Sequence, residues 1–172
     1  MVPKYQFYTV AEDKKDDKYQ LDFNSVYECD DSMKKVGNSV ALSALDWTFG
    51  PVTKEDGGVY FSMKSSATSM FSYVEFVNHL AANETNAARV KFDIKLEGMK
   101  WQKSTAKLCF EYRFHSTGKD DDPKDVKDGK KASVGEANFG IEEEAEDGAG
   151  KKHRVQVCVG AQTRLCVDAC RV

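Results

Sequence analysis

Two runs of alternating residues between Val90 and Phe114 constrain the fold more than any other part of the chain. In the first run, apolar residues recur at every second position from Val90 to Leu96, and charged residues fill the positions between them. The second run, from Ala106 to Phe114, repeats the pattern. A period of two places the apolar side chains on one face of a β-strand, whereas a helix would scatter the charges around its circumference. The sequence therefore predicts two half-buried strands.

We expect these two strands to pair as an antiparallel hairpin. Charges on the exposed face select the register, because unlike charges that oppose each other stabilise a sheet and like charges destabilise it. The favoured register sets Lys95 opposite Glu111 and Asp93 opposite Arg113. Gly98 interrupts the first strand and predicts a β-bulge that flips the phase of the residues after it.

Alternation and turn residues predict further strands elsewhere in the chain. The Ser39–Phe49 run is apolar on both faces, which is typical of a central strand. Residues 66–82 carry apolar residues at helical spacing, but β-branched and aromatic residues favour a strand from about Phe71 to Leu80. The remaining predicted strands are Tyr5–Val10, Tyr19–Cys29, Val59–Met63, Ala132–Glu144, His153–Val159 and Thr163–Val172.

This pattern of elements indicates an all-β fold. About nine strands, and at most one short helix at 66–82, are typical of an antiparallel β-sandwich or a jelly roll. A length of 172 residues fits a single β-sandwich domain over 1–172. With 41% hydrophobic and 31% charged residues, the composition is globular rather than disordered.

Charge and hydropathy exclude two classes of partner. The formal charge is −3, from 25 basic and 28 acidic side chains that are interspersed, so no positive field attracts a nucleic acid. No run approaches the roughly 18 apolar residues that a membrane span needs, and the first residues lack the apolar centre of a signal peptide. The compartment stays open, with an extracellular location favoured. Asn83–Thr85 is an N-glycosylation acceptor if the chain is secreted.

A loop between predicted strands carries the candidate metal ligands. Calcium requires a cluster of hard oxygen ligands, which a folded loop of carboxylates can supply. The spacing departs from the EF-hand pattern, and lysines within the loop offset much of the negative charge, so the alternative is a solvated loop of mixed charge. His115 and His153 flank acidic loops, but two histidines without a third ligand are weak candidates. The candidate calcium ligands are Asp120, Asp121, Asp122, Asp125 and Asp128.

The five cysteines are an odd number, so at least one is free or pairs between chains. Cys158 and Cys166 lie on equivalent faces of two successive predicted strands, and a tight return between the strands would set them roughly opposite each other. This predicts a cross-strand disulfide. A disulfide that joins Cys170 to another sheet is also possible. The alternative is that Cys109 and some of the other cysteines are reduced, buried and apolar in character. The spacing does not match a zinc site.

The sequence favours a function without catalysis. Nucleophile signatures such as GxSxG are missing, so a small hydrolase ranks third. The favoured function is an interaction or structural module that acts through its surface, with a protein partner or self-association at a sheet edge formed by Tyr5–Val10 or Thr163–Val172. The second hypothesis is a calcium-dependent domain that binds a ligand such as a carbohydrate, with Trp47 or Trp101 as a stacking surface.

Overall fold

The structure is almost entirely β-strand, and every strand pair is antiparallel. The all-β antiparallel class expected for a β-sandwich is therefore confirmed. None of the helical structure described is long and apolar enough to cross a membrane. This structure, a computed structural model, describes residues 4–8, 18–55, 57–82, 88–116, 124–127, 131–134, 137–140, 144–146, 149–158 and 163–167.

The chain divides into two compact units. The first comprises Ala44–Lys100, and the second comprises Val2–Ser43 together with Trp101–Val172. The first unit contains a five-stranded sheet, and the second contains a seven-stranded and a three-stranded sheet. The expectation of one domain over 1–172 stays a prediction.

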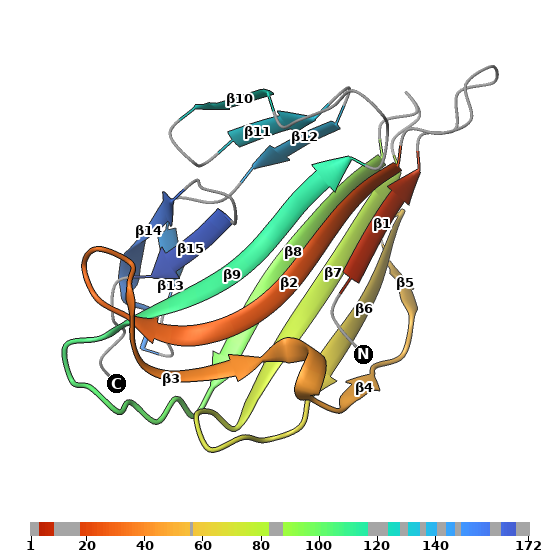
Figure 1. Cartoon of the computed structure of the whole chain (residues 1–172). Helices are drawn as coiled ribbons and strands as arrows, with labels where there is room; N and C mark the ends of the chain where they lie inside the picture. The colour runs from red at the N-terminus through yellow and green to blue at the C-terminus, as the bar shows by residue number, and fades with distance from the viewer. Residues whose placement is uncertain are drawn as a thin grey trace. The chain divides into compact units, whose positions relative to one another are not determined.

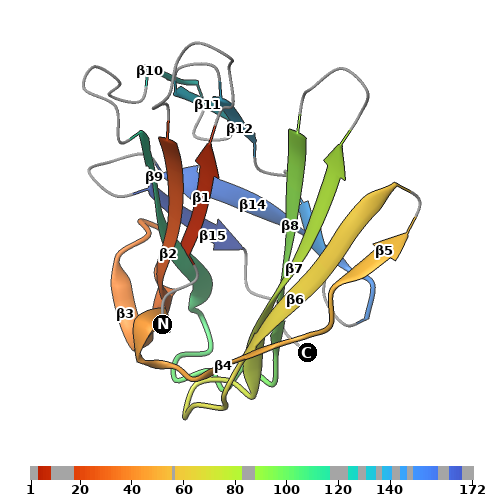
Figure 2. The same ribbon diagram turned by 90° about the vertical axis from the view of Figure 1, so that its right-hand side faces the viewer.

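The five-stranded sheet of the first unit has the order β4-β6-β7-β8, and β5 also pairs with β6 (Figure 2). Alternation in β7 decides which of its faces is buried, because Val74, Phe76 and Asn78 are fully buried while the residues between them are partly exposed. The strands are β4 (Trp47–Phe49), β5 (Thr53–Glu55), β6 (Gly58–Ser65), β7 (Tyr73–Ala82) and β8 (Ala88–Glu97).

The seven-stranded sheet of the second unit has the order β1-β2-β9-β15-β14-β13, and β3 also pairs with β2 (Figure 1). Its strands are β1 (Lys4–Tyr8), β2 (Lys18–Cys29), β3 (Lys35–Ala41), β9 (Lys107–Ser116), β13 (Glu144–Glu146), β14 (Lys152–Cys158) and β15 (Thr163–Val167). The three-stranded sheet comprises β10 (Lys124–Lys127), β11 (Lys131–Val134) and β12 (Ala137–Gly140), and a 3-10 turn covers Leu42–Ala44.

The core of the seven-stranded sheet lies along β2 and β9. Leu21 and Val26 of β2 are fully buried, and Phe23 packs against Tyr112 of β9 with ring centroids 6.1 Å apart. The register between the two strands shifts between Phe23 and Ser25, so a β-bulge lies at Asn24. After the shift, the four residues Val26–Cys29 are all buried, which makes this half of β2 a strand covered on both faces.

The predicted hairpin between Val90 and Phe114 is wrong, although both strands exist. β8 pairs with β7, and Lys95 lies opposite Glu75. β9 instead pairs with β2 and β15, and Glu111 lies opposite Ser25 and Arg164. The charge argument failed because Glu75 offers Lys95 the same complementarity that Glu111 does.

Other predicted elements are confirmed or corrected in detail. Residues 66–82 form a loop and the strand β7, so the strand interpretation is confirmed and the helix is wrong. Ser39–Phe49 is not one strand, because β3, the 3-10 turn and β4 divide it. Ala132–Glu144 likewise divides among β11, β12 and the start of β13. Gly98 follows the end of β8 in a left-handed conformation, with φ of 65°, rather than forming a bulge within the strand.

The terminal segments proposed as sheet edges differ in position. β1 lies at one end of the seven-stranded order, as an edge strand requires. β15 lies between β9 and β14, so the expectation of an edge at Thr163–Val172 is wrong for its described part. The sequence could not reveal this, because strand order depends on pairing between segments far apart in the chain.

Candidate functional site

A hollow with a volume of about 340 Å³ lies in the first unit and is lined mainly by polar side chains. Two carboxylates, one ammonium, four hydroxyls, one aromatic ring and one glycine border it. A volume of this size is at the small end of ligand sites, which span about 300–1,000 Å³. The lining residues are Asp46, Thr48, Phe49, Gly50, Ser62, Lys64, Ser65, Ser66 and Glu75.

The short strand β4 builds one wall of the hollow by pairing with the end of β6. Thr48 lies opposite Lys64 in this pairing, and the segments before and after β4 are fixed by backbone hydrogen bonds. Ser66 N–H donates to the Asp46 carbonyl at 2.8 Å, and Gly50 N–H donates to the Ser62 carbonyl at 2.9 Å. A β-carbon at Gly50 would lie 2.8 Å from the Ser62 hydroxyl oxygen, so a glycine keeps this wall close to β6.

Charge alternates across the strands that border the hollow. Lys64 of β6 lies opposite Glu75 of β7, which in turn lies opposite Lys95 of β8. The Lys64 ammonium lies 3.5 Å from the ring centroid of Tyr73, a cation–π contact that holds it over the sheet. Asp46 and Glu75 outnumber the single lysine among the lining residues, so the formal charge of the lining is negative. This charge disfavours anionic ligands.

The hydroxyls of the hollow fall into two groups. Ser65 accepts a hydrogen bond from Val74 N–H at 2.9 Å and donates to the Ser66 carbonyl at 3.0 Å. Ser66 accepts from Asp46 N–H at 3.4 Å. The hydroxyls of Thr48 and Ser62 make no hydrogen bond among the residues that the structure describes. The first pair therefore supports the wall, and the second pair can face a ligand.

An exposed apolar surface lies beside these polar groups. Phe49 lines the hollow with 55% of its surface exposed, and Val52, three residues later, is 67% exposed. Single exposed apolar side chains are ordinary on protein surfaces, but an aromatic ring beside convergent polar groups is an arrangement found at ligand sites. The hollow therefore offers one aromatic face together with acceptors and hydroxyls.

A second polar cluster lies on the half-exposed face of β7 and β8. His79 Nε2 lies 3.1 Å from a carboxylate oxygen of Asp93, and Lys91 lies 3.2 Å from the other oxygen. The ring of Tyr60 meets His79 edge-on, with centroids 4.7 Å apart. A carboxylate that orients an imidazole is one part of a general-base arrangement. No serine or cysteine within the described residues completes it by a hydrogen bond to His79, so the hydrolase hypothesis stays a prediction.

The structure places few of the predicted ligand-binding residues. Asp125 lies in β10, whereas Asp120, Asp121, Asp122 and Asp128 lie outside the described residues, so the calcium site stays a prediction. Among the described residues, no group of three or more side chains is arranged to hold a metal ion.

The two tryptophans occupy different environments, each within its own unit. Trp47 of β4 is half-buried against Phe76, with ring centroids 5.8 Å apart, and it does not line the hollow. Trp101 is half-buried in the segment before β9. Phe49, two residues after Trp47, is the exposed aromatic residue at the hollow. The sequence signal for Phe49 was its position at the end of an apolar run, directly before Gly50 and Pro51.

A disulfide joins Cys29 of β2 to Cys109 of β9, with their Cα atoms 6.1 Å apart, so the alternative of a reduced Cys109 is wrong. Both residues are fully buried, and they form a small apolar cluster with Tyr27 and Met33. The predicted pair Cys158 and Cys166 lies on the adjacent strands β14 and β15, where their disulfide stays a prediction.

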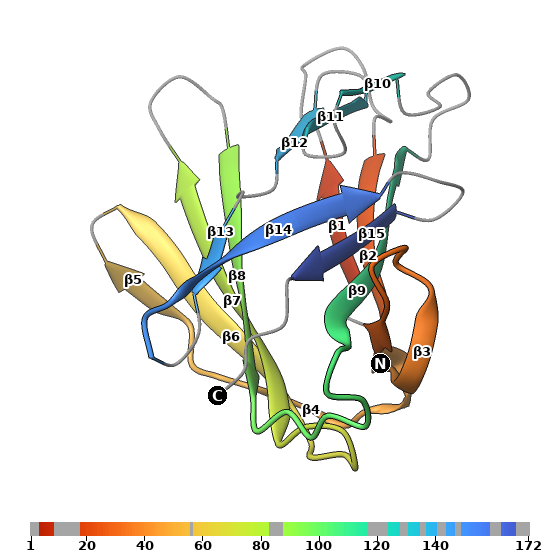
Figure 3. The same cartoon turned by 90° about the vertical axis from the view of Figure 1, so that its left-hand side faces the viewer.

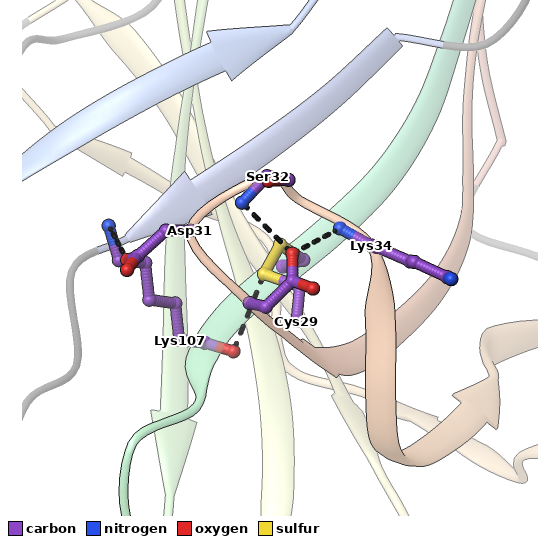
Figure 4. A network of polar contacts seen from close by, with 7 residues as sticks. Cys29, Asp31, Ser32, Lys34 and Lys107 are labelled. Atoms are coloured by element: carbon purple, nitrogen blue, oxygen red, sulfur yellow. Dashed lines mark hydrogen bonds and ion pairs between the residues drawn. A yellow bond between two sulfur atoms is a disulfide. The ribbon is translucent and has the colours of Figure 1, made fainter.

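The turn between β2 and β3 covers this disulfide cluster (Figure 4). A carboxylate oxygen of Asp30 accepts hydrogen bonds from the backbone N–H groups of Ser32 and Lys34, both at 2.9 Å. This holds Met33 in a left-handed conformation, with φ of 59°, while its side chain stays buried. Asp31 on the same turn forms an ion pair with Lys107 of β9 at 3.0 Å.

Glu28 is a buried carboxylate that the sequence pattern did not identify. Alternation along the predicted strand Tyr19–Cys29 places Glu28 on the polar face, but the side chain has no exposed surface. One oxygen accepts hydrogen bonds from Gln102 N–H at 2.6 Å and Lys103 N–H at 3.3 Å, and the other accepts from Asn38 N–H at 2.8 Å. Because these donors are backbone N–H groups, no residue type in the sequence indicates that they bind the Glu28 carboxylate.

Comparison of the chain with protein-family models, with curated proteins and with solved structures gives no match.

Proposed function

We propose that the chain is a non-enzymatic interaction module that acts through its surface, and that the hollow beside Phe49 binds a carbohydrate. The observation that supports this proposal is the combination of an exposed aromatic ring with carboxylate and hydroxyl groups around one cavity. Ligand sites commonly pair an apolar surface with a few convergent polar groups that fix orientation.

The lining chemistry matches a neutral sugar better than other small ligands. A sugar has hydroxyl groups that donate to carboxylates, and charge-assisted hydrogen bonds of this kind are among the stronger polar contacts. The acceptors are Asp46 and Glu75, and Thr48 and Ser62 both donate and accept. The C–H face of a sugar ring is apolar and suits the exposed ring of Phe49. The size of the cavity favours one or two sugar rings.

Other ligand classes fit the same residues less well. An anion such as a phosphate would face two carboxylates and one lysine, which is itself held over Tyr73. A purely apolar ligand would leave the carboxylates of Asp46 and Glu75 without hydrogen bonds, which is costly once water is displaced. The hollow requires no metal ion, so the proposal differs from the calcium-dependent hypothesis in its expected response to chelation.

The experiment is a calorimetric titration of the full chain with cellobiose, lactose and maltose, each with calcium and with a chelator. We expect one of these neutral disaccharides to bind in both conditions, and Phe49→Ala to weaken that binding at least tenfold. Val52→Ala is the matched control, because Val52 is a neighbouring apolar residue that is even more exposed than Phe49 but does not line the hollow. Binding that survives Phe49→Ala, binding that requires calcium, or no binding of any of the three sugars would each contradict the proposal.

A further inference from the structure

Four of the five cysteines occupy four adjacent strands of the seven-stranded sheet. The strand order places β15 between β9 and β14, and β2 on the other side of β9 (Figure 3). Cys166 of β15 lies directly opposite Cys109 of β9 in the register. Residues that oppose each other on neighbouring strands share a face of the sheet, so these two positions are neighbours on one face. The positions in strand order are Cys29, Cys109, Cys166 and Cys158.

Two further pairs of neighbours, Cys29 with Cys109 and Cys166 with Cys158, have the same diagonal relationship. Cys109 lies opposite Tyr27, two residues before Cys29, and Cys166 lies opposite Gln156, two residues before Cys158. In each pair, both cysteines are displaced from direct opposition toward the C-terminal ends of their strands. Because the four strands alternate in direction, the two diagonals run the same way across the sheet.

Backbone distances allow Cys109 to bond with either neighbour. The diagonal separation of Cys29 and Cys109 is 6.1 Å between Cα atoms. Directly opposed residues of antiparallel strands are about 4.5 or 5.5 Å apart, and disulfides span about 4.4–6.8 Å. The opposed pair Cys109 and Cys166 therefore meets the same distance requirement as the disulfide that the structure contains.

We propose that Cys109 and Cys166 form a thiol–disulfide exchange site that moves the covalent link from β2–β9 to β9–β15. The starting state has the Cys29–Cys109 disulfide of the structure together with the predicted Cys158–Cys166 disulfide. A dissolved thiol such as glutathione attacks Cys158, forms a mixed disulfide there and releases the Cys166 thiolate. That thiolate attacks Cys109 Sγ, a Cys109–Cys166 bond forms, and Cys29 leaves as a thiolate. The second step is an exchange without net oxidation or reduction.

The surroundings of the existing disulfide favour an attack from within the sheet. Cys29 and Cys109 have no exposed surface, and Met33 and Tyr27 belong to the same buried cluster, so a dissolved thiol cannot reach this bond. The released Cys29 thiolate must then take up a proton. The resulting thiol can donate to the Lys107 carbonyl oxygen, which lies 3.6 Å from Cys29 Sγ.

The test uses a full chain with Cys158→Ser and Cys170→Ser, which leaves Cys166 reduced beside the intact Cys29–Cys109 bond. The protein is held at about pH 8.5, where the thiolate is populated, then quenched in acid, alkylated, digested and analysed by mass spectrometry. We expect two linked species, Cys29–Cys109 and Cys109–Cys166, and alkylation divided between Cys166 and Cys29. Alkylation confined to Cys166 would overturn the proposal.

The matched control carries Cys166→Ser and Cys170→Ser, which leaves the thiol at Cys158. Cys158 lies opposite Arg164 and is not a register neighbour of Cys109, so only Cys29–Cys109 is expected to form. Equal exchange from Cys158 would show that register does not govern the reaction and would overturn the proposal. In the unmodified chain, one free thiol at Cys170 and a Cys158–Cys166 peptide are expected, and limiting glutathione should generate the Cys109–Cys166 peptide. A map without Cys158–Cys166, or one unchanged by glutathione, would also overturn it.

Discussion

The carboxylate of Glu28 accepts a hydrogen bond from the backbone N–H of Gln102 at 2.6 Å, across 74 residues of sequence. The same side chain also accepts from Lys103 N–H and from Asn38 N–H, and it has no exposed surface. Glu28 therefore fixes the segment before β9 and the strand β3 to β2. A buried charge is tolerated where hydrogen bonds replace its hydration, and these three donors provide that replacement.

Glu28→Gln should destabilise the second unit. An amide has one acceptor oxygen, so its NH₂ group would face at least one backbone N–H and leave that donor without a partner. We expect a loss of about 3 kcal/mol in the free energy of unfolding, because hydrogen bonds to charged groups contribute about 1.5–3 kcal/mol each. Denaturant unfolding measures this. Glu97→Gln, on the exposed end of β8, is the control and should change stability by less than about 0.5 kcal/mol.

Gly37→Ala should act through Glu28. A β-carbon at position 37 would overlap Glu28 Oε2, so alanine must displace the carboxylate from its three donors. A double-mutant cycle with Glu28→Ala isolates this coupling, because it removes the overlapping carboxylate and leaves only the approach of 3.0 Å to the β-carbon of residue 28. We expect Gly37→Ala to cost at least about 2 kcal/mol in the parent chain and less than about 1 kcal/mol in the Glu28→Ala chain. Additive costs would show that Gly37 is required for another reason.

Asp30→Ala should loosen the turn that covers the disulfide. Its carboxylate holds the N–H groups of Ser32 and Lys34, and we expect their release to cost about 1–2 kcal/mol in denaturant unfolding. Asp31→Ala is a neighbouring control. Asp31 is 92% exposed and contributes one ion pair with Lys107, which solvent screens, so its loss should cost less than about 1 kcal/mol. Equal effects of the two substitutions would contradict the assigned role of Asp30.

Tyr112 should make the protein sensitive to alkali. Burial raises the pKa of Tyr112 above its ordinary value, so the folded state keeps this proton where the unfolded state loses it. Above about pH 10, the ordinary tyrosine pKa, the folded state binds more protons than the unfolded state, and stability falls by about 1.4 kcal/mol per pH unit. Below that pH the effect vanishes. We expect thermal unfolding of Tyr112→Phe between pH 8 and 11.5 to show a shallower decline than the parent chain.

The half-exposed Tyr60 provides the control for this pH series. Tyr60→Phe removes a tyrosine from β6 and should leave the alkaline slope of the parent chain in place. If Tyr112→Phe and the parent chain decline with the same slope, then the alkaline sensitivity has another source. An absorbance titration at 295 nm offers an independent check. Tyr112→Phe should lack a tyrosine whose ionisation requires a pH above the ordinary tyrosine range.

The sequence predicted strands well and their partners poorly, for a physical reason. Alternation is a local property, so the periods in β7, β8 and β9 were visible in the residues themselves. Pairing depends on complementarity between distant segments, and the exposed charges were not selective. Lys95 lies opposite Glu75 of β7, although Glu111 of β9 carries the same charge and would complement Lys95 equally well.

The candidate site was less predictable than the fold. The hollow combines β4, the end of β6 and a residue of β7, and only their pairing brings Asp46, Phe49 and Glu75 to one cavity. Trp47 was predicted as a stacking surface for a ligand, but alternation along β4 turns its ring toward Phe76. Glu28 was missed because its partners are backbone groups, which carry no residue signature.

The most direct test of the proposed carbohydrate site is a ¹⁵N–¹H chemical-shift map of the full chain, recorded during titration with the disaccharide that gives the largest calorimetric signal. We expect the largest shifts at the backbone amides of Thr48, Phe49, Gly50 and Ser62, with saturation at one affinity for all four. Shifts that cluster instead on the acidic segment around Asp125, or that disappear when calcium is chelated, would contradict the assignment of the hollow as the binding surface.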